Sequence, residues 1–580
     1  MSLAVDVLSR GVKSLAPFRQ SDGELTDPIV GEPTQYATPY HAWGNAVLAA
    51  YGPESDRQRH RAAATAGLRA ALHHLRNPDT TSTWSGVEVA TASARGKVQH
   101  RDFFWPPVLK SVRLLSAHQL LTAAEEDELR STIKAVEVPE VFGSRPPSNW
   151  SMVWLAGEWL RIVEGLSPNT TAEVDGWLQT FVDESFVAQL GLYTENGLPN
   201  AYDLFTRVHL SELLAAGYDG VLRDQLLAFL AAGVQRSLAL QLSDGSLASG
   251  HRSASQTWNL GAQLQLFTLA EQLGLGTDET RHAAHRALRS MARWQRPDGP
   301  YSPVLNLHPP QRRVGYEGYT SDAHYSSLAL GFLASAVAAG LPVEPAGPAD
   351  RRESVRIERE PTYRATAHQG RISVGVQTAA DGRYDGTGLV DVTFGPESRL
   401  NLVSSVRHLS GGPWFNPGLA IKGSVHRTET VPLSDVVHRP EPGSPAKPAD
   451  GRIGIEATSM LAPDDESSPL RGERSTLAIE LIEDGVEVTQ TIEHDHHAAF
   501  FLPYPVDIGD GVMTEVERTD SGARLINGDE TVDLELDAAI SDWLLLPPDY
   551  RNRRAVCGLI RIDLDGPVRE LRWRLRHHRS

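Results

Sequence analysis

The spacing of apolar positions divides the chain into two parts. From about Pro39 to Gly340, apolar residues recur at intervals of three and four, with short polar or Pro/Gly breaks between the runs. This periodicity is typical of amphipathic helices. It predicts helices near residues 39–52, 57–76, 104–118, 123–135, 149–165, 171–189, 201–217, 222–242, 256–273, 278–296 and 322–339. Because each helix must bury one apolar stripe, helical hairpins around a common axis are expected.

The pattern changes after Gly340. The segment LPVEPAGPADRRESVRIERE is rich in Pro, Ala and charge and has no apolar period, which indicates a linker. Beyond it, short alternating runs such as RISVGVQT, GLVDVTF, STLAIELIE and LIRIDL are separated by DG, NG and GG turns. Such runs predict an antiparallel β region. The Pro-rich segment from His438 to Arg452 is expected to be an exposed loop between strands.

Together the two patterns predict an α+β multidomain protein. We expect an N-terminal extension over residues 1–38, an (α/α) toroid catalytic domain over 39–345, and an antiparallel β-sandwich over 346–580. Carbohydrate-active enzymes use this layout, although architecture alone is only an analogy for function. In such a toroid, functional residues are expected in the loops and helix starts at one mouth.

Composition narrows the classes of function. The 580-residue chain has a formal net charge of -18, which argues against a nucleic-acid partner and against a membrane surface, since both favour a basic face. No run approaches the roughly 18 apolar residues of a membrane span. The single cysteine, Cys557, excludes an intramolecular disulfide. The start of the chain has no apolar signal segment, so a cytoplasmic location is expected, or a secreted one if a leader was removed. No cofactor is expected, and the oligomeric state stays open.

The helix predicted at residues 149–165 begins with a polar and aromatic group. Asn149 follows two prolines and Ser148. It is either helix punctuation or an amide donor to a substrate carboxylate or hydroxyl. Trp150 and Trp154 are spaced to share a helix face, where a tryptophan is either a core residue or a platform for a sugar ring.

The segment GLYTENGLPNAYDLFTRVHL concentrates polar residues before and within the next helix. Asp203 has a plain structural role at a helix start, with Arg207 four residues on as its ion-pair partner. Tyr202 carries a phenol that could transfer a proton. His209 lies two turns into the helix, where a core or supporting role is the simpler interpretation.

Two further helix entrances carry similar groups. SDGSLASGHRSASQTWNLGAQ contains a Gly-His-Arg loop, His251 and Arg252, followed by Gln256 and Trp258 at the helix start. RRVGYEGYTSDAHYSSLAL precedes the last helix, where aromatic and polar groups suit sugar binding or a capped helix. Its candidates are Tyr316, Glu317, Tyr319 and His324.

Two weaker signals complete the set. HRDFFWPPVL places Trp105 at another helix start, where it could contribute to the same mouth. The run EHDHH, which includes His494–His497, looks like a metal site. Alternation along a strand sends adjacent side chains to opposite faces, so no metal site is assigned there.

These segments resemble known families. SNWSMVWLAGEWLRIVEG and ENGLPNAYDLFTRVHL resemble segments of heparinase II/III-like and alginate-lyase-like polysaccharide lyases. With DGSLASGHRS and YTSDAHYSSLALGFL, they are also similar to an uncharacterised-domain family linked to exo-acting glucuronidases. The lyase resemblance implies that Asn149 neutralises a uronate carboxylate and that Tyr202 transfers the proton. Those lyases have His after the Tyr, whereas this chain has Asp203, so His251 or His209 would have to supply the second base.

The leading hypothesis is therefore a bacterial enzyme that cleaves a uronic-acid-containing glycan by β-elimination. It assigns proton transfer to Tyr202, carboxylate stabilisation to Asn149 and Arg252, and assistance to His251. The alternative is a glycoside hydrolase, plausibly exo-acting on terminal glucuronate, which needs two carboxylates, one of them Asp203. A non-catalytic glycan-binding protein is the alternative from another class. The sequence leaves the sugar, the linkage and the endo or exo mode open.

Overall fold

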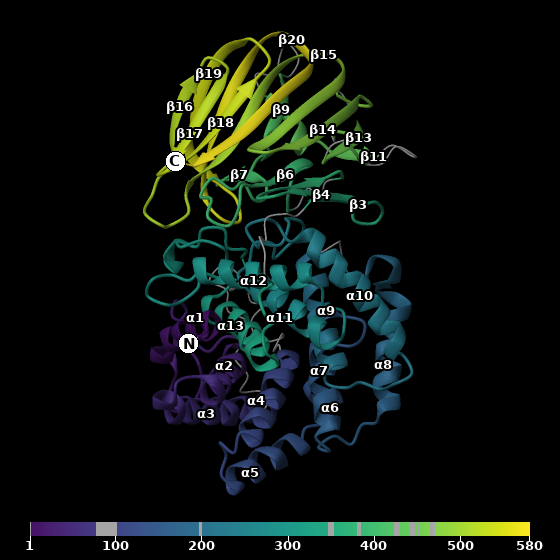
Figure 1. Ribbon diagram of the computed structural model, residues 1–580, viewed down its shortest axis with the longest axis vertical. Helices are drawn as coiled ribbons and strands as arrows, with labels where there is room; N and C mark the ends of the chain where they lie inside the picture. Colours follow the sequence, from purple (N-terminus) through teal and green to yellow (C-terminus); the bar gives the residue numbers. More distant parts are fainter. Residues whose placement is uncertain are drawn as a thin grey trace. The chain divides into compact units, whose positions relative to one another are not determined.

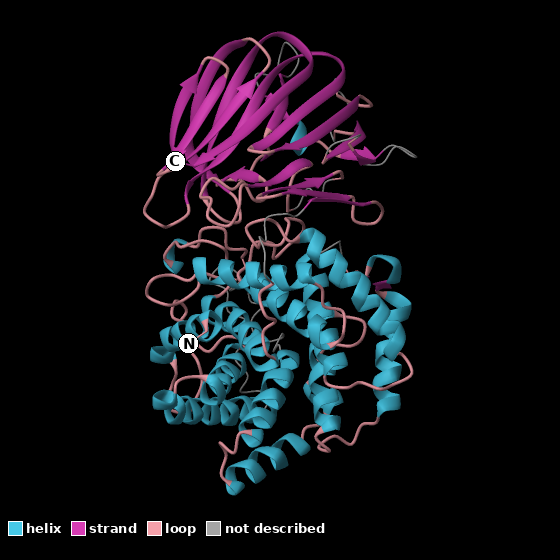
Figure 2. Cartoon of the chain, viewed as in Figure 1, coloured by secondary structure: helices cyan, strands magenta, loops and turns pink. Residues whose placement is uncertain are grey.

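The computed structural model describes residues 2–76, 101–195, 200–318, 320–345, 353–379, 384–422, 430–440, 447–449, 453–463, 468 and 470–579. The chain forms two compact units. Unit 1 comprises Met1–Leu238, Gln256–Gln311 and Tyr316–Pro345, and unit 2 comprises Ala239–Ser255, Arg312–Gly315 and Ala346–Ser580. Figure 2 shows the helices that make up most of the first unit and the strands that make up most of the second. The short segments 239–255 and 312–315 thus group with the strands.

Six helices form a closed inner ring in unit 1. Each packs against the next, and the last packs against the first (Figure 1). Several of these helices are buried on nearly every side, as an inner helix must be. The ring consists of α2 (Ala37–Tyr51), α4 (Trp105–Ala117), α7 (Asn149–Val163), α9 (Asn200–Ala215), α11 (Trp258–Gln272) and α13 (Asp322–Ala339).

The remaining long helices of unit 1 lie outside that ring. They expose one face, and α1, α3, α5, α8 and α12 each pack against an inner helix. They are α1 (Leu3–Leu15), α3 (Arg57–Arg76), α5 (Ala123–Lys134), α8 (Thr171–Glu184), α10 (Arg223–Leu240) and α12 (Asp278–Arg293). The short helix α6 (Val138–Val141) and a small hairpin, β1 (Phe186–Val187) with β2 (Leu192–Tyr193), complete the described part of the unit.

Side-chain caps explain where several helices begin. Ser148 and Ser151 form a reciprocal capping box at the start of α7, with the Ser151 amide donating to the Ser148 hydroxyl over 3.1 Å. Thr122 with Glu125 and Thr277 with Thr280 do the same for α5 and α12. The cap of α7 is therefore Ser148, which leaves the Asn149 side chain for another contact.

Unit 2 is built from two antiparallel sheets. The smaller sheet has four strands in the order β3 (Glu353–Glu358), β4 (Arg364–Gln369), β5 (Ile372–Gln377) and β6 (Gly388–Thr393). The larger sheet has fourteen strands among the described residues, with the path β11-β13-β14-β15-β20-β18-β17-β16. Its strands are β7 (Val406–His408), β8 (Trp414–Phe415), β9 (Gly418–Lys422), β10 (Thr430–Pro432), β11 (His438–Pro440), β12 (Lys447–Pro448), β13 (Gly454–Leu461), β14 (Arg474–Ile482), β15 (Gly485–Asp507), β16 (Glu515–Thr519), β17 (Gly522–Asn527), β18 (Glu530–Leu536), β19 (Ile540–Arg551) and β20 (Val556–Arg579).

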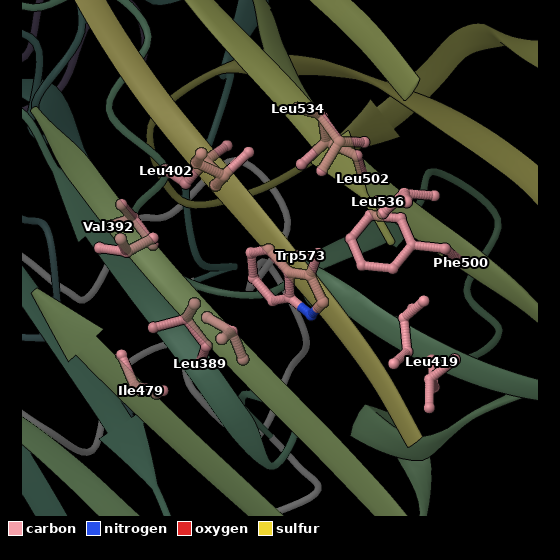
Figure 3. Packing of buried hydrophobic residues seen from close by; sticks show 14 of the residues in the cluster. Leu389, Val392, Leu402, Leu419, Ile479, Phe500, Leu502, Leu534, Leu536 and Trp573 are labelled. Atoms are coloured by element: carbon pink, nitrogen blue, oxygen red, sulfur yellow. The ribbon is translucent and has the colours of Figure 1, made fainter. Parts of the chain in front are cut away.

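One apolar core joins the two sheets into a sandwich. Buried side chains of the smaller sheet, such as Leu389 and Val392, share a cluster with Ile479, Phe500 and Trp573 of the larger one (Figure 3). The rings of Phe500 and Trp573 meet edge to face, with centroids 5.3 Å apart. Burying aromatic rings of this size supplies much of the driving force for closing such a sandwich.

The predicted fold class is confirmed: a helical toroid precedes an antiparallel β-sandwich. Every predicted helix is present, with ends shifted by a few residues. Residues 1–38, predicted as an extension, contain the additional helix α1, whose Val7 and Leu8 are buried against the toroid. The loop predicted from His438 to Arg452 is partly wrong, because β11 and β12 lie within it and pair with β13. Among the described helices, none is long and apolar enough to cross a membrane.

Candidate active site

The starts of the inner helices of unit 1 meet in a layer of aromatic rings. Tyr36, at the start of α2, stacks on Phe103 of η4 (Arg101–Phe104) with centroids 4.5 Å apart and lies 5.1 Å from the His324 ring of α13. Phe103 also contacts Trp150, the second residue of α7, at 6.1 Å. We call this layer the toroid mouth; it consists of Tyr36, Phe103, Trp150, Tyr202, Phe205, Trp258 and His324. These helix starts therefore lie together at one end of the ring.

Asn149 links the mouth to the end of the hairpin formed by β1 and β2. Its Nδ2 donates a hydrogen bond of 2.6 Å to Glu195 Oε2, and the Tyr193 hydroxyl donates to the same oxygen over 2.8 Å. Burial, reinforced by the neighbouring Glu195 carboxylate, raises the pKa of Tyr193 far above its ordinary value, so the phenol keeps its proton and can donate. Asn149 is buried, and its Oδ1 has no hydrogen-bond partner within the described ranges. The amide is thus held by one N–H, while its second N–H and its oxygen are left for other contacts.

Tyr202 and Asp203 are neighbours in sequence with opposite environments. Tyr202 is half-buried in the first turn of α9, and its ring lies nearly parallel to that of Trp258, with centroids 6.5 Å apart. Asp203 is fully buried and lies 2.7 Å from Arg207 Nη2 and 2.5 Å from Arg236 Nη1. Its Oδ1 also accepts from the Tyr193 backbone amide over 2.8 Å. Both cations and a backbone donor therefore hold the Asp203 carboxylate in place.

His209 lies deeper in the ring than the mouth. Its Nδ1 is 2.7 Å from Glu212 Oε2, and its ring contacts those of Phe205 and Phe332. Glu212 also receives Lys110 Nζ at 2.5 Å. Burial alone would raise the pKa of Glu212, but the Lys110 ammonium and the His209 ring hold that pKa well below its usual range. These residues form a charged layer inside the ring that involves α4 and α9.

Of the three candidate tryptophans at helix starts, Trp105 and Trp258 are buried. Trp258 is 1% exposed, and its Nε1 donates over 2.5 Å to Gln256 Oε1. Trp105 is fully buried, with Nε1 donating over 2.9 Å to Glu158 and with Arg161 above its ring. Of the candidate tryptophans, Trp150 retains partial exposure at the mouth.

The segment before α13 contributes a further set of polar side chains to unit 1. The Tyr316 hydroxyl donates to Asp322 Oδ1 over 2.8 Å, and burial, followed by the charge of Asp322, raises the pKa of Tyr316 well above its ordinary value. Glu317 is half-buried, whereas His324 is fully buried beside Tyr36 and Tyr325. Tyr319 lies outside the described residues.

His251 and Arg252 belong to unit 2. His251 has a positive φ of 62°, its ring centroid is 4.7 Å from that of Tyr384, and its carbonyl accepts a hydrogen bond from the Arg553 guanidinium. Ser249, two residues earlier, donates to both oxygens of Asp391, from its amide over 2.8 Å and from its hydroxyl over 2.6 Å. The loop that carries these two candidates is therefore bound tightly to the sandwich.

The EHDHH run lies in β15. His496 Nε2 is 2.7 Å from Glu473 Oε1, and His494 Nδ1 is 3.3 Å from the same oxygen. Within the part of the chain that the structure describes, no group of three or more His, Cys, Asp or Glu side chains is arranged to hold a metal ion.

The contact between Asn149 and Glu195, which lie 46 residues apart, was not predicted from the sequence. Nor were Tyr193, Arg236 and the pair of Lys110 with Glu212. One signal was available: Arg236 interrupts the apolar run FLAAGVQRSLAL, where a buried guanidinium demands a carboxylate partner.

Comparison with models of protein families found no match, and comparison with curated proteins found none. Solved structures gave matches of low identity. The chain is similar to the Streptomyces coelicolor A3 chondroitin AC lyase in complex with chondroitin sulphate, with 13% identity over 100% of this chain and 79% of that one and a TM-score of 0.47. Heparinase III has 8% identity over 100% and 85%, with a TM-score of 0.45.

A glycosyl hydrolase family 88 protein from Bacteroides vulgatus is a further match. It has 10% identity over 58% of this chain and 99% of that one, with a TM-score of 0.37. At such identities and TM-scores, the chemistry of the toroid mouth has to be derived from its own residues.

Proposed function

We propose that this chain is a carbohydrate-active enzyme whose toroid mouth binds a uronic-acid-containing glycan and cleaves it by β-elimination. The observation that carries the proposal is the contrast between Tyr202 and Asp203. Asp203 is locked between Arg207 and Arg236, whereas Tyr202 is half-buried beside the rings of the mouth. The residue with a transferable proton at this helix start is therefore the phenol.

The reaction requires three changes on one sugar ring. The C5 proton leaves, the C4–O bond breaks, and a double bond forms between C4 and C5. Tyr202 would act as the phenolate that takes the C5 proton, and the phenol thus formed would return that proton to the departing oxygen. During proton removal, negative charge builds up on the uronate carboxylate, which needs a neutral or cationic donor.

Asn149 fits that donor role. One of its amide N–H groups is fixed on Glu195, and the other can donate to the substrate carboxylate. Glu195 then acts as a positioning residue that sets the orientation of the amide, with Tyr193 holding Glu195 in turn. Trp150, partly exposed beside them, offers an aromatic face to a sugar ring. The roles predicted for His251 and Arg252 stay predictions.

A glycoside hydrolase that acts on terminal glucuronate in the exo mode is the second candidate. The half-buried Glu195 carboxylate at the mouth favours it, because hydrolysis needs two carboxyl groups across the scissile bond. The ion pairs of Asp203 oppose the version in which that residue is one of the two. A glycan-binding protein without activity is the third candidate.

The test is incubation of the whole protein with a panel of uronate glycans. Elimination produces a conjugated 4,5-unsaturated uronate that absorbs in the ultraviolet, whereas hydrolysis releases reducing ends without that absorbance. We expect Tyr202→Phe to lower turnover by about 10²- to 10⁴-fold while glycan binding is kept. Tyr51→Phe, at an exposed position at the end of α2, is the matched control and should leave turnover unchanged.

Three other results would each change the assignment. Reducing ends without ultraviolet absorbance would replace elimination by hydrolysis. Full activity in Tyr202→Phe would remove Tyr202 from the mechanism. Binding of the glycans without turnover in the wild type would leave only the binding protein.

A further inference from the structure

The carboxyl group of Asp391, on β6, joins segments of unit 2 that are far apart in the sequence. Ser249 donates to both of its oxygens, from the backbone amide to Oδ2 over 2.8 Å and from the hydroxyl to Oδ1 over 2.6 Å. The Ser404 amide also donates to Oδ1, over 3.1 Å. Asp391 is 1% exposed, and Gly375 of β5 leaves room for its carboxylate, because a Cβ at that position would collide with Oδ2. The carboxyl group is thus a buried junction between the segment 239–255, the smaller sheet and the loop that contains Ser404.

The two arginines of the turn between β19 and β20 are paired with other carboxylates. Arg553 Nη2 lies 3.2 Å from Asp385 Oδ2, and Arg554 Nη1 lies 2.6 Å from Asp244 Oδ2. Within the described ranges, the hydrogen bonds to Asp391 come from serines, and no Lys, Arg or His forms an ion pair with it. Asp391 is therefore a buried carboxyl group held by neutral donors.

Three further titratable side chains belong to the same part of unit 2. His251 and Arg252 follow on the segment 239–255, and Arg364 of β4 lies against the backbone of that segment. None of the three donates a hydrogen bond to Asp391 among the described residues. Their charges therefore do not replace a direct cationic partner.

These surroundings favour the protonated form of Asp391. Burial raises the pKa of Asp391 to about 6, and the negative charge of Asp385 acts in the same direction, while the hydrogen bonds from Ser249 and Ser404 oppose the shift. The Ser249 hydroxyl can accept a hydrogen bond as well as donate one, so it can turn to accept from a proton on Oδ1. The two bonds from backbone amides remain possible in both states. The junction can thus gain or lose a proton without a change of fold.

We propose that Asp391 is a proton-controlled latch on the segment 239–255. The latch is closed while Asp391 carries its proton. When the proton leaves, a buried charge without a cation remains, and opening becomes easier because the opened carboxylate is hydrated. This segment carries His251 and Arg252, so the latch controls how firmly these two side chains are held. It is a property of unit 2 and does not depend on the reaction proposed for the toroid mouth.

The direction of the pH dependence follows from the raised pKa of Asp391. The stabilisation of the closed latch is fully present below the ordinary pKa of 3.8, declines as the pH rises, and is lost above about 6. The segment is therefore held most firmly in acid and more loosely at neutral pH. Local opening of this kind is measured by the exchange of backbone amides with solvent.

The test is hydrogen–deuterium exchange of the full-length protein between about pH 4 and pH 7, corrected for the intrinsic exchange rate. We expect the opening constant of residues 245–253 to rise by about 50-fold over this range. The hairpin of β16 and β17, in the same unit, is the internal control and should not follow this trend.

Two variants assign the trend to one carboxyl group. Asp391→Asn is nearly isosteric and has no proton to lose, so exchange of residues 245–253 should stay nearly constant across the same pH range. Asp549→Asn, at an exposed position of β19, removes the same charge elsewhere in unit 2. It is the matched control and should keep the wild-type trend.

Three results would overturn the proposal. Constant exchange of residues 245–253 in the wild type would show that no proton controls this segment. The wild-type trend in Asp391→Asn would assign the effect to another group. An equal trend in the hairpin of β16 and β17 would show that the whole unit opens and that the segment has no latch of its own.

Discussion

The toroid mouth and the charged layer inside the same ring use carboxylates in opposite ways. In the interior, Asp203 is paired with Arg207 and Arg236, and Glu212 lies against Lys110 and His209, all with little exposure. At the mouth, the half-buried Glu195 receives the neutral donors of Asn149 and Tyr193.

This difference distinguishes carboxylates that stabilise the fold from carboxylates that can take part in a reaction. A carboxylate between buried cations cannot change its charge without leaving those cations unpaired, so it stabilises the fold and does not transfer protons. The hydrogen bonds that Glu195 accepts from Asn149 and Tyr193 come from neutral groups, which do not need its charge. Asp203 belongs to the first kind of carboxylate. Tyr202, adjacent to it in sequence, is half-buried at the mouth.

The largest effect is expected for Asp203→Asn. Removing the negative charge leaves two buried guanidinium groups uncompensated, which should lower the free energy of unfolding by about 3 to 5 kcal/mol. Chemical denaturation followed by tryptophan fluorescence measures it. Tyr202→Phe, one residue away, should change stability by less than about 1 kcal/mol. Equal losses of stability in Asp203→Asn and Tyr202→Phe would contradict the assignment of a structural role to Asp203 alone.

The loss of stability at low pH tests whether the Glu212 carboxylate is charged in the native state. The native pKa of Glu212 is depressed, so its stabilising contribution is present above the unfolded value of about 4.3 and is lost as the pH falls toward the native value. We expect Glu212→Gln to destabilise the protein by about 1 to 3 kcal/mol at neutral pH and by less in acid. Denaturation curves at several pH values give the difference. A penalty that does not change with pH would contradict the assignment of charge to this layer.

Asp391 extends the comparison to unit 2, because the contacts that hold this buried carboxylate come from Ser249 and Ser404, which are neutral. Burial raises the pKa of Asp391 to about 6. Between its ordinary value of 3.8 and about 6, the unfolded state releases the proton while the native state keeps it, so rising pH lowers stability. The difference corresponds to a loss on the order of 3 kcal/mol.

Asp391→Asn has no proton to release. Relative to the wild type, it should become progressively more stable from about pH 4 to pH 6, measured by urea denaturation. Asp385→Asn, at the neighbouring buried carboxylate that is paired with Arg553, is the comparison variant and should not show this trend. A flat difference between Asp391→Asn and the wild type would show that the carboxylate is charged throughout.

The smallest effect is expected for Glu195→Gln. A glutamine oxygen can still accept from Asn149 and Tyr193, so under β-elimination turnover should fall only about threefold to tenfold, with no loss of stability. Under hydrolysis by Glu195, the same variant should lose activity by about 10²-fold or more. Assays of both variants, Glu195→Gln and Tyr202→Phe, on the same glycan therefore decide between the two reactions.

The helices and the sandwich could be predicted because each element carries its own periodicity. The apolar spacing of residues 149–165 matches α7, and the alternation of STLAIELIE matches β14. The missed helix α1 is as periodic as the others, but its first residues were considered only as a possible leader. Local pattern therefore predicted the long helices and strands, but it missed the short strands β11 and β12 in the Pro-rich segment.

The candidate site was predictable only in part. The density of polar residues at helix starts indicated Asn149 and Tyr202, but the contact of Asn149 with Glu195 depends on the meeting of two helices. Burial likewise could not be derived from sequence, and it separates the core residue Trp105 from Trp150 at the mouth. Partnerships between distant residues are set by packing, which no local pattern encodes.

The assignment of residues 239–255 to unit 2 affects how the protein can be dissected. A fragment that begins at residue 346 would lack Asp244, whose carboxylate lies 2.6 Å from the buried Arg554 guanidinium. It would also lack Ala239, whose carbonyl accepts from Thr366 and His368 of β4. Expression of the sandwich alone therefore needs the 239–255 segment supplied by a grafted linker or a circularly permuted gene.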